Sequence, residues 1–233
     1  MSVEELVAQL QAALGSSLVG VVLYGSAAVN AQVAGHSDLN VLVIAETLPV
    51  EQLRILGQTA RAWGEAGQAP PLMLTRREWE GSADVFPMEY ADILERHRVL
   101  AGTLPLEGIA VQAADLRLQV EQEALGKLLR LRRAITAAGT DVARQRELLK
   151  GSSSAFQVIL RSLLRLLGEQ PPADAAAMLA RIAERTGLTM APFLRVQQVV
   201  RGEAVSDTEV PVLVAAYLDG ADALSRYIDQ LAI

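Results

Sequence analysis

The sequence contains no cysteine in 233 residues. Disulfide bonds, thiolate catalysis and cysteine-ligated zinc are therefore excluded, although a chain without cysteine fits any cellular compartment. It also has no apolar run of the roughly 18 residues that cross a bilayer. The opening segment, MSVEELVAQLQAAL, lacks the basic start and unbroken apolar core of a signal peptide. These absences lead us to expect a soluble, cytoplasmic protein.

An excess of basic residues is also missing. The 21 Lys and Arg side chains are outnumbered by 27 Asp and Glu, which gives a formal net charge of −6. A chain with this balance has no general attraction to nucleic acid or to an anionic membrane. We therefore expect neither as a partner.

The first half of the chain predicts a mixed α/β domain. Two short apolar segments, LVGVVLY and LNVLVIA, are typical of strands covered on both faces. Apolar spacing and terminal signals add further elements. We expect strands over 18–24, 39–45 and 70–75, and helices over 3–14, 26–33, 50–66 and 86–102, the last begun by Pro87 and ended by Gly102.

The second half predicts an all-helical bundle. From Asp115 onward several long segments repeat apolar residues at helical spacing, with no convincing strand. One predicted stripe comprises Leu125, Leu128, Leu129 and Ile135, and another helix is expected to start at the serines of GSSS, 151–154. Later helices are expected after QPPAD and TGLTMAP, with the last over 209–232. We place the domain boundary near Gly108, which gives an α/β domain over 1–108 and a helical bundle over 109–233.

The segment between the first two strands carries the strongest chemical signal. Gly25 and Ser26 follow the first strand, where backbone N–H groups and a hydroxyl can hold a phosphate. An ordinary turn with a helix cap is the competing interpretation. In SDLNVLVI, Asp38 and Asn40 are two residues apart and therefore point to the same face of an extended chain. Hard oxygen ligands beside a phosphate are what Mg²⁺ prefers.

Gly25-Ser26 followed by Asp38-Leu39-Asn40 resembles the signature of the nucleotidyltransferase superfamily, a Gly-Ser turn with Asp-x-Asp on the next strand. The resemblance extends in particular to aminoglycoside-type adenylyltransferases and their bacterial relatives, which share the look of FPMEYADILERHRVLAG and LRLQVEQEALGKLLRLRRA. It implies a small mixed sheet with flanking helices, followed by a helical bundle. It also implies ATP or another nucleoside triphosphate as ligand, with Gly25, Ser26 and Ser37 at the phosphates.

The same resemblance implies three carboxylates that hold two Mg²⁺ ions for attack on the α-phosphorus. Asp38 matches the first and is the expected metal ligand, but Asn40 stands at the second and supplies no charge. The third falls around Met73, in an apolar strand. Two unit charges about 4 Å apart interact by roughly 4 kcal/mol at an effective dielectric of 20, before solvation offsets. We therefore expect Mg²⁺ to be held weakly at Asp38 and Asn40.

Two other groups of charged residues are candidates. Glu89, Asp92 and Glu95 share one face of a predicted helix and could supply a displaced acid, or they could form an ordinary solvated face. Between Asp115 and Glu169 ten Lys or Arg accompany six Asp or Glu. In this basic segment Lys127 and Arg130 could contact a triphosphate, or they could lie on a solvated helix exterior.

Three functions fit these observations. The leading hypothesis is a nucleotidyltransferase-fold protein that keeps a nucleotide cleft but has impaired catalysis. The second is an active Mg²⁺-dependent adenylyltransferase acting on a small hydroxyl acceptor. The third is a non-catalytic scaffold that dimerises through its leucine-rich helical half.

Overall fold

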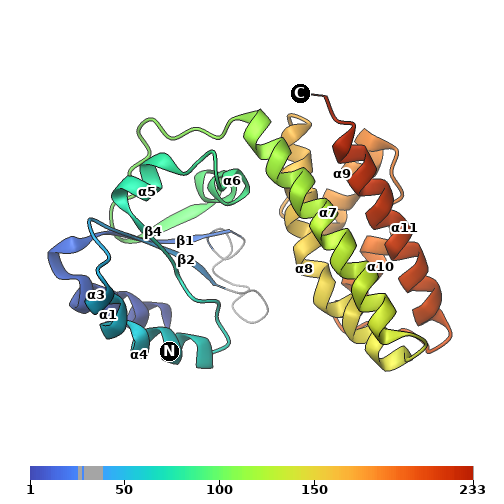
Figure 1. Ribbon diagram of the computed structural model, residues 1–233, viewed down its shortest axis with the longest axis horizontal. Coiled ribbons are helices and arrows are strands. Elements are labelled where there is room, and N and C mark those ends of the chain that lie inside the picture. The colour runs from blue at the N-terminus through green and yellow to red at the C-terminus, as the bar shows by residue number, and fades with distance from the viewer. Residues whose placement is uncertain (26–27, 29–38, 233) are drawn as a thin grey trace. The chain divides into compact units, whose positions relative to one another are not determined.

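The computed structural model of the chain describes residues 1–25, 28 and 39–232. It divides into two compact units, Met1–Val111 and Gln112–Ile233 (Figure 1). Each unit has its own buried core, and each is described separately below. The helix expected over 26–33 falls almost wholly outside the described residues.

The first unit is built on a four-stranded sheet in the order β3-β2-β1-β4. β1 (Leu18–Tyr24) lies antiparallel to both β2 (Asn40–Ala45) and β4 (His97–Gly102), while β2 and β3 (Leu72–Thr75) are parallel. The interior residues of β1 and β2 are buried on both faces, which explains their unbroken apolar sequences.

Helices cover the two faces of this sheet (Figure 1). On one face α1 (Val3–Leu14) and α4 (Gly57–Glu65) pack Leu6, Leu10 and Trp63 against Val21 and Val43. The neighbouring strand residues point to the other face, because side chains alternate along a strand. There Val22, Leu42 and Ile44 pack against Trp79 of α5 (Arg76–Gly81) and against Tyr90 and Ile93 of α6 (Pro87–Glu95).

The prediction of one helix ending at Gly102 is wrong. The helix ends at Glu95, and HRVLAG forms the edge strand β4. Gly102 has φ 67°, and a β-carbon there would lie 2.1 Å from the carbonyl oxygen of Val19. The glycine is therefore required by the close approach of β4 to β1, and it does not terminate a helix.

Two other helices differ from the predictions. The segment expected as one helix over 50–66 forms α3 (Val50–Ile55) and α4, which are separated at the buried residue Leu56. Helix α5 was not expected. It begins with a capping box in which Thr75 and Glu78 satisfy each other's backbone N–H groups, and the spacing T-x-x-E was a readable signal for it.

The described residues of the second unit form helices joined by turns and loops, with no strand, as expected. It comprises α7 (Ala113–Ala138), α8 (Val142–Leu166), α9 (Ala175–Thr186), α10 (Ala191–Val200) and α11 (Glu209–Asp229). Its centre holds three aromatic rings, Phe156, Phe193 and Tyr217, in mutual edge-to-face contacts with centroids 5.1–5.5 Å apart.

Two details of the helical prediction are wrong. The GSSS serines lie inside α8, because Asp141 caps this helix ten residues earlier by accepting a hydrogen bond from the Arg144 N–H. On α7, Leu128 is buried but Leu125 and Leu129 are 48% and 44% exposed.

Dimerisation through this half stays a prediction. Within the described residues, no helix is both long and apolar enough to cross a membrane.

Candidate functional site

The predicted site begins where β1 ends. Tyr24 pairs directly with Asn40 of β2 on one side and with His97 of β4 on the other. Directly paired residues of antiparallel strands present their side chains on the same face. Three polar side chains from three strands therefore gather at one end of the sheet, on the face that α6 covers.

Gly25 turns the chain at this point. It has φ 78°, a left-handed conformation that glycine adopts without strain, and its N–H donates to the carbonyl of Arg96 at 3.0 Å. A β-carbon on Gly25 would lie 3.4 Å from Nδ2 of Asn40. The structure therefore brings together Gly25 and Asn40, two of the residues that the sequence motif selected.

Three other predicted site residues, Ser26, Ser37 and Asp38, lie outside the described residues. Their assigned roles at the phosphate and the metal stay predictions.

The third strand presents a leucine at this face. In the parallel register Leu72 lies beside Leu42, and both pack against the α5 and α6 side. Met73 packs into the opposite core with α1 and α4. The third acidic position was predicted around Met73, but Met73 itself faces away from Asn40, because side chains alternate across the sheet. Of the residues around Met73, Leu72 and Leu74 share the face of Asn40, and Leu72 is the nearer to it in the register.

Helix α6 brings acids to the same end of the sheet. Glu89 and Asp92 are half-buried, whereas Glu95 is exposed. Burial raises the pKa of the Tyr24 phenol, and the negative charges of Glu89 and Asp92 raise it further. Glu89 and Asp92 therefore lie within electrostatic range of the end of β1. Tyr24 was not expected at this site, although an aromatic residue directly before the glycine turn was visible in the sequence.

His97 has a structural partner. It was expected within a helix but is the first residue of β4, and its ring Nδ1 lies 2.8 Å from the carbonyl oxygen of Ile93. This contact holds the ring against the end of α6.

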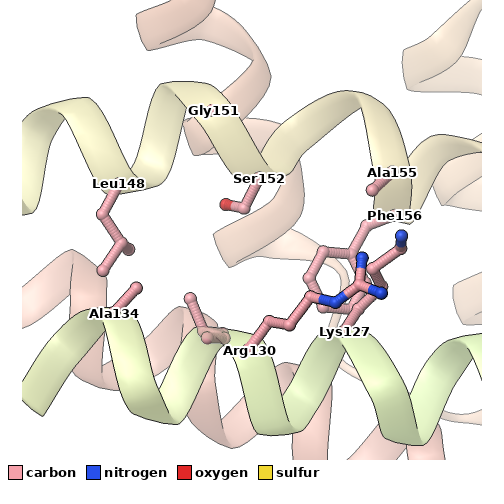
Figure 2. A pocket seen from close by; sticks show the side chains of 9 residues that line it. Lys127, Arg130, Ala134, Leu148, Gly151, Ser152, Ala155 and Phe156 are labelled. Atoms are coloured by element: carbon pink, nitrogen blue, oxygen red, sulfur yellow. The ribbon is translucent and has the colours of Figure 1, made fainter.

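Lys127 and Arg130 line a cavity of about 330 Å³ between α7 and α8. Figure 2 shows both side chains on α7, opposite Ser152 and Ala155 of α8. Lys127 pairs with Glu123 at 3.2 Å, and Arg130 is exposed. Their contact with a nucleotide stays a prediction. The alternative, that these residues lie on a solvated helix exterior, did not anticipate a cavity between α7 and α8.

Comparison with known proteins identifies the fold. No protein-family model matches the sequence, and it has no significant match among curated proteins. Among solved structures, it is similar to the spectinomycin adenyltransferase AAD(9) from Enterococcus faecialis, whose crystal structure was determined with ATP and spectinomycin. The identity is 14% and the TM-score 0.60, over 97% of this chain and 98% of that chain. The chain has a nucleotidyltransferase-like fold.

The described residues of this nucleotidyltransferase-like fold do not make a two-metal site. At this end of the sheet β2 offers one amide oxygen, from Asn40, while Leu72 of β3 offers none. No group of three or more His, Cys, Asp or Glu suited to a metal occurs in the described part of the chain. Any strong Mg²⁺ site therefore depends on carboxylates from outside β2 and β3.

Proposed function

We propose that the protein binds a nucleoside triphosphate at the end of β1 and β2, and that it transfers nucleotidyl groups weakly or not at all. The glycine turn at Gly25 and the adjacent Asn40 amide supply the phosphate-binding end of this site. The similarity in fold to an adenyltransferase crystallised with ATP supports a triphosphate as the ligand.

The observation that carries the proposed impairment is that Asn40 and Leu72, an amide and an apolar side chain, lie on the same face of the neighbouring strands β2 and β3. A carboxylate at each position would give a divalent cation two negative charges, and each charge pair at about 4 Å contributes roughly 4 kcal/mol at an effective dielectric of 20, before desolvation. An amide and a leucine contribute neither charge. With Asp38 as the remaining acid of the motif, Mg²⁺ is held weakly, and a second ion is not retained while pyrophosphate leaves.

The test separates binding from transfer. Calorimetry with a non-hydrolysable ATP or GTP analogue and Mg²⁺ measures binding, and we expect saturable binding that Gly25→Val removes. Purified protein is then incubated with labelled ATP or GTP, Mg²⁺ or Mn²⁺, and an acceptor panel that includes spectinomycin. We expect no labelled product above background. Robust transfer overturns the proposed impairment, whereas a lack of nucleotide binding overturns the proposal as a whole.

A second candidate is an active adenylyltransferase in which α6 supplies the missing acid to a small hydroxyl acceptor. The influence of Glu89 and Asp92 on the pKa of Tyr24 favours it, because it places two carboxylates near the glycine turn. For this function Asp38→Ala and Glu89→Ala each abolish transfer. Glu95→Ala, on the same helix but exposed, is the matched control and leaves transfer unchanged.

A further inference from the structure

The cavity between α7 and α8 is formed by the helical unit alone. All of its lining residues come from these two helices (Figure 2). Its volume of about 330 Å³ lies at the lower end of the range of small-molecule sites, about 300–1,000 Å³. The cavity is therefore large enough for one small ligand.

The cavity exists because α8 carries small residues where it faces α7. Gly151, Ser152 and Ala155 line one wall, and Ala134 lies opposite. The backbone does not require the glycine, since Gly151 has no positive φ and a β-carbon there would meet no atom within 4 Å. Glycine inside a helix costs about 1 kcal/mol relative to alanine. Gly151 therefore weakens α8 at the position where a larger side chain would fill the cavity.

The two ends of the cavity differ in chemistry. The apolar side chains of Leu148 and Ala134 lie together at one end, and the nitrogen atoms of Lys127 and Arg130 lie at the other (Figure 2). Buried Phe156 adds an aromatic surface. This arrangement matches a ligand with an apolar body and a charged group at one end.

The charge at the polar end is positive and only partly neutralised. Lys127 has one ion pair, to Glu123 of its own helix, and its side chain is 24% exposed. Arg130 forms no ion pair or hydrogen bond with any residue that the structure describes. Its planar guanidinium is suited to a carboxylate or a phosphate. A cationic ligand would be repelled.

We propose that this cavity binds a small amphiphilic anion, with a short alkyl or aryl body against Leu148 and Ala134 and a carboxylate or phosphate at Arg130 and Lys127. The Ser152 hydroxyl lies between the two ends (Figure 2). It lies 3.1 Å from the Leu149 carbonyl oxygen, to which it donates, and 3.4 Å from the Tyr217 hydroxyl, and it keeps a lone pair that can accept a hydrogen bond from a ligand. The proposal does not depend on nucleotide binding at the end of β1 and β2, although it assigns to a different ligand the two residues, Lys127 and Arg130, that the sequence predicted to contact a triphosphate.

Calorimetric titration of the full chain with octanoate and with octyl phosphate tests the proposal, with octan-1-ol as the uncharged probe. We expect saturable binding of at least one anion and clearly weaker binding of the alcohol. A preference between the two anions identifies the head group. Failure of both anions to saturate the protein at millimolar concentration, or equal binding of the alcohol, overturns the proposal.

Paired variants locate the binding. Arg130→Ala should weaken binding of the preferred anion by about tenfold or more, whereas Arg133→Ala, an exposed arginine of the same helix that does not line the cavity, should change it by less than about twofold. Equal losses in the two variants indicate general charge attraction and overturn the proposal.

A second pair tests the volume. Gly151→Leu should abolish binding by filling the cavity, with thermal stability at or above that of the unmodified chain. Gly126→Leu, at a helical glycine that also has open space but lies outside the cavity, should leave binding intact. Undiminished binding in the stably folded Gly151→Leu variant overturns the proposal.

Discussion

The side-chain amide nitrogen of Asn40 lies 3.4 Å from the position that a β-carbon on Gly25 would occupy. The two residues are far apart in sequence but adjacent in space, because Tyr24 and Asn40 pair directly across β1 and β2. The turn at Gly25 and the start of β2 at Asn40 therefore form one local structure. A substitution at either residue therefore alters the packing around the other.

Gly25→Ala is expected to destabilise the folded chain. The distance to Asn40 is an ordinary contact, so the cost comes from the positive φ of 78°. A left-handed conformation costs a non-glycine residue about 1–2 kcal/mol. Chemical denaturation should show a loss of that size. Gly126→Ala, within helix α7, should instead raise stability by up to about 1 kcal/mol. Unchanged stability of Gly25→Ala would show that its turn is not held in this conformation.

Asn40→Asp is expected to strengthen nucleotide binding only when Mg²⁺ is present. The added carboxylate supplies a charge for the cation, and calorimetry should show about tenfold tighter binding of a non-hydrolysable triphosphate with Mg²⁺. In EDTA the same charge repels the triphosphate, so affinity should fall. The two titrations thus form an internal control. A gain of equal size in both would contradict the location of the metal beside Asn40.

The sequence predicted the elements whose signals are local. The apolar runs of β1 and β2, the helical periods and the turn at Gly25 were all readable, and the fold class followed from their order and from the family resemblance. The motif also selected Asn40 correctly as a neighbour of Gly25. These features depend on residues that are close in the chain or on alternation along one strand.

The missed helix α5 and the misplaced start of α8 had local capping signals at Thr75 and Asp141, whereas the other errors depend on contacts between distant segments. HRVLAG looks like a continuation of α6, but β1 offers it a backbone partner and Gly102 permits the close approach to Val19. Which residue around Met73 shares a face with Asn40 depends on the register between β2 and β3, which no local pattern contains. The cavity beside Gly151 likewise arises only when α8 meets α7.

Tyr217 is expected to make the protein sensitive to alkaline pH. Burial in the aromatic cluster raises the pKa of its phenol to about 12. The folded chain therefore keeps a proton that the unfolded chain releases above about pH 10. This stabilisation is complete below pH 10 and is lost as the pH rises toward 12, by up to about 1.4 kcal/mol per pH unit.

Urea denaturation at pH 9–12 measures this loss. The pKa of Tyr90 is also raised to about 12 by burial, so Tyr217→Phe should reduce the alkaline slope without abolishing it. An alkaline slope that Tyr217→Phe does not alter would mean that the phenol is hydrated.

Removing one charge from α6 should lower the pKa of Tyr24. Burial is the main cause of the raised value, and the carboxylates of Glu89 and Asp92 add to it by disfavouring the phenolate. Glu89→Gln keeps the size of the side chain but removes its charge, so the Tyr24 phenol should ionise at lower pH. Ring-carbon NMR shifts of labelled tyrosine, followed against pH, report this ionisation directly.

Glu95→Gln is the control, because Glu95 lies on the same helix but is exposed and is not among the charges that act on Tyr24. If the Tyr24 titration moves equally in both variants, the effect is one of net charge rather than proximity. If it moves only with Glu89, a carboxylate of α6 acts at the end of β1 beside the glycine turn. The active-transferase candidate requires that proximity, so an unchanged Tyr24 pKa in Glu89→Gln would remove its structural support.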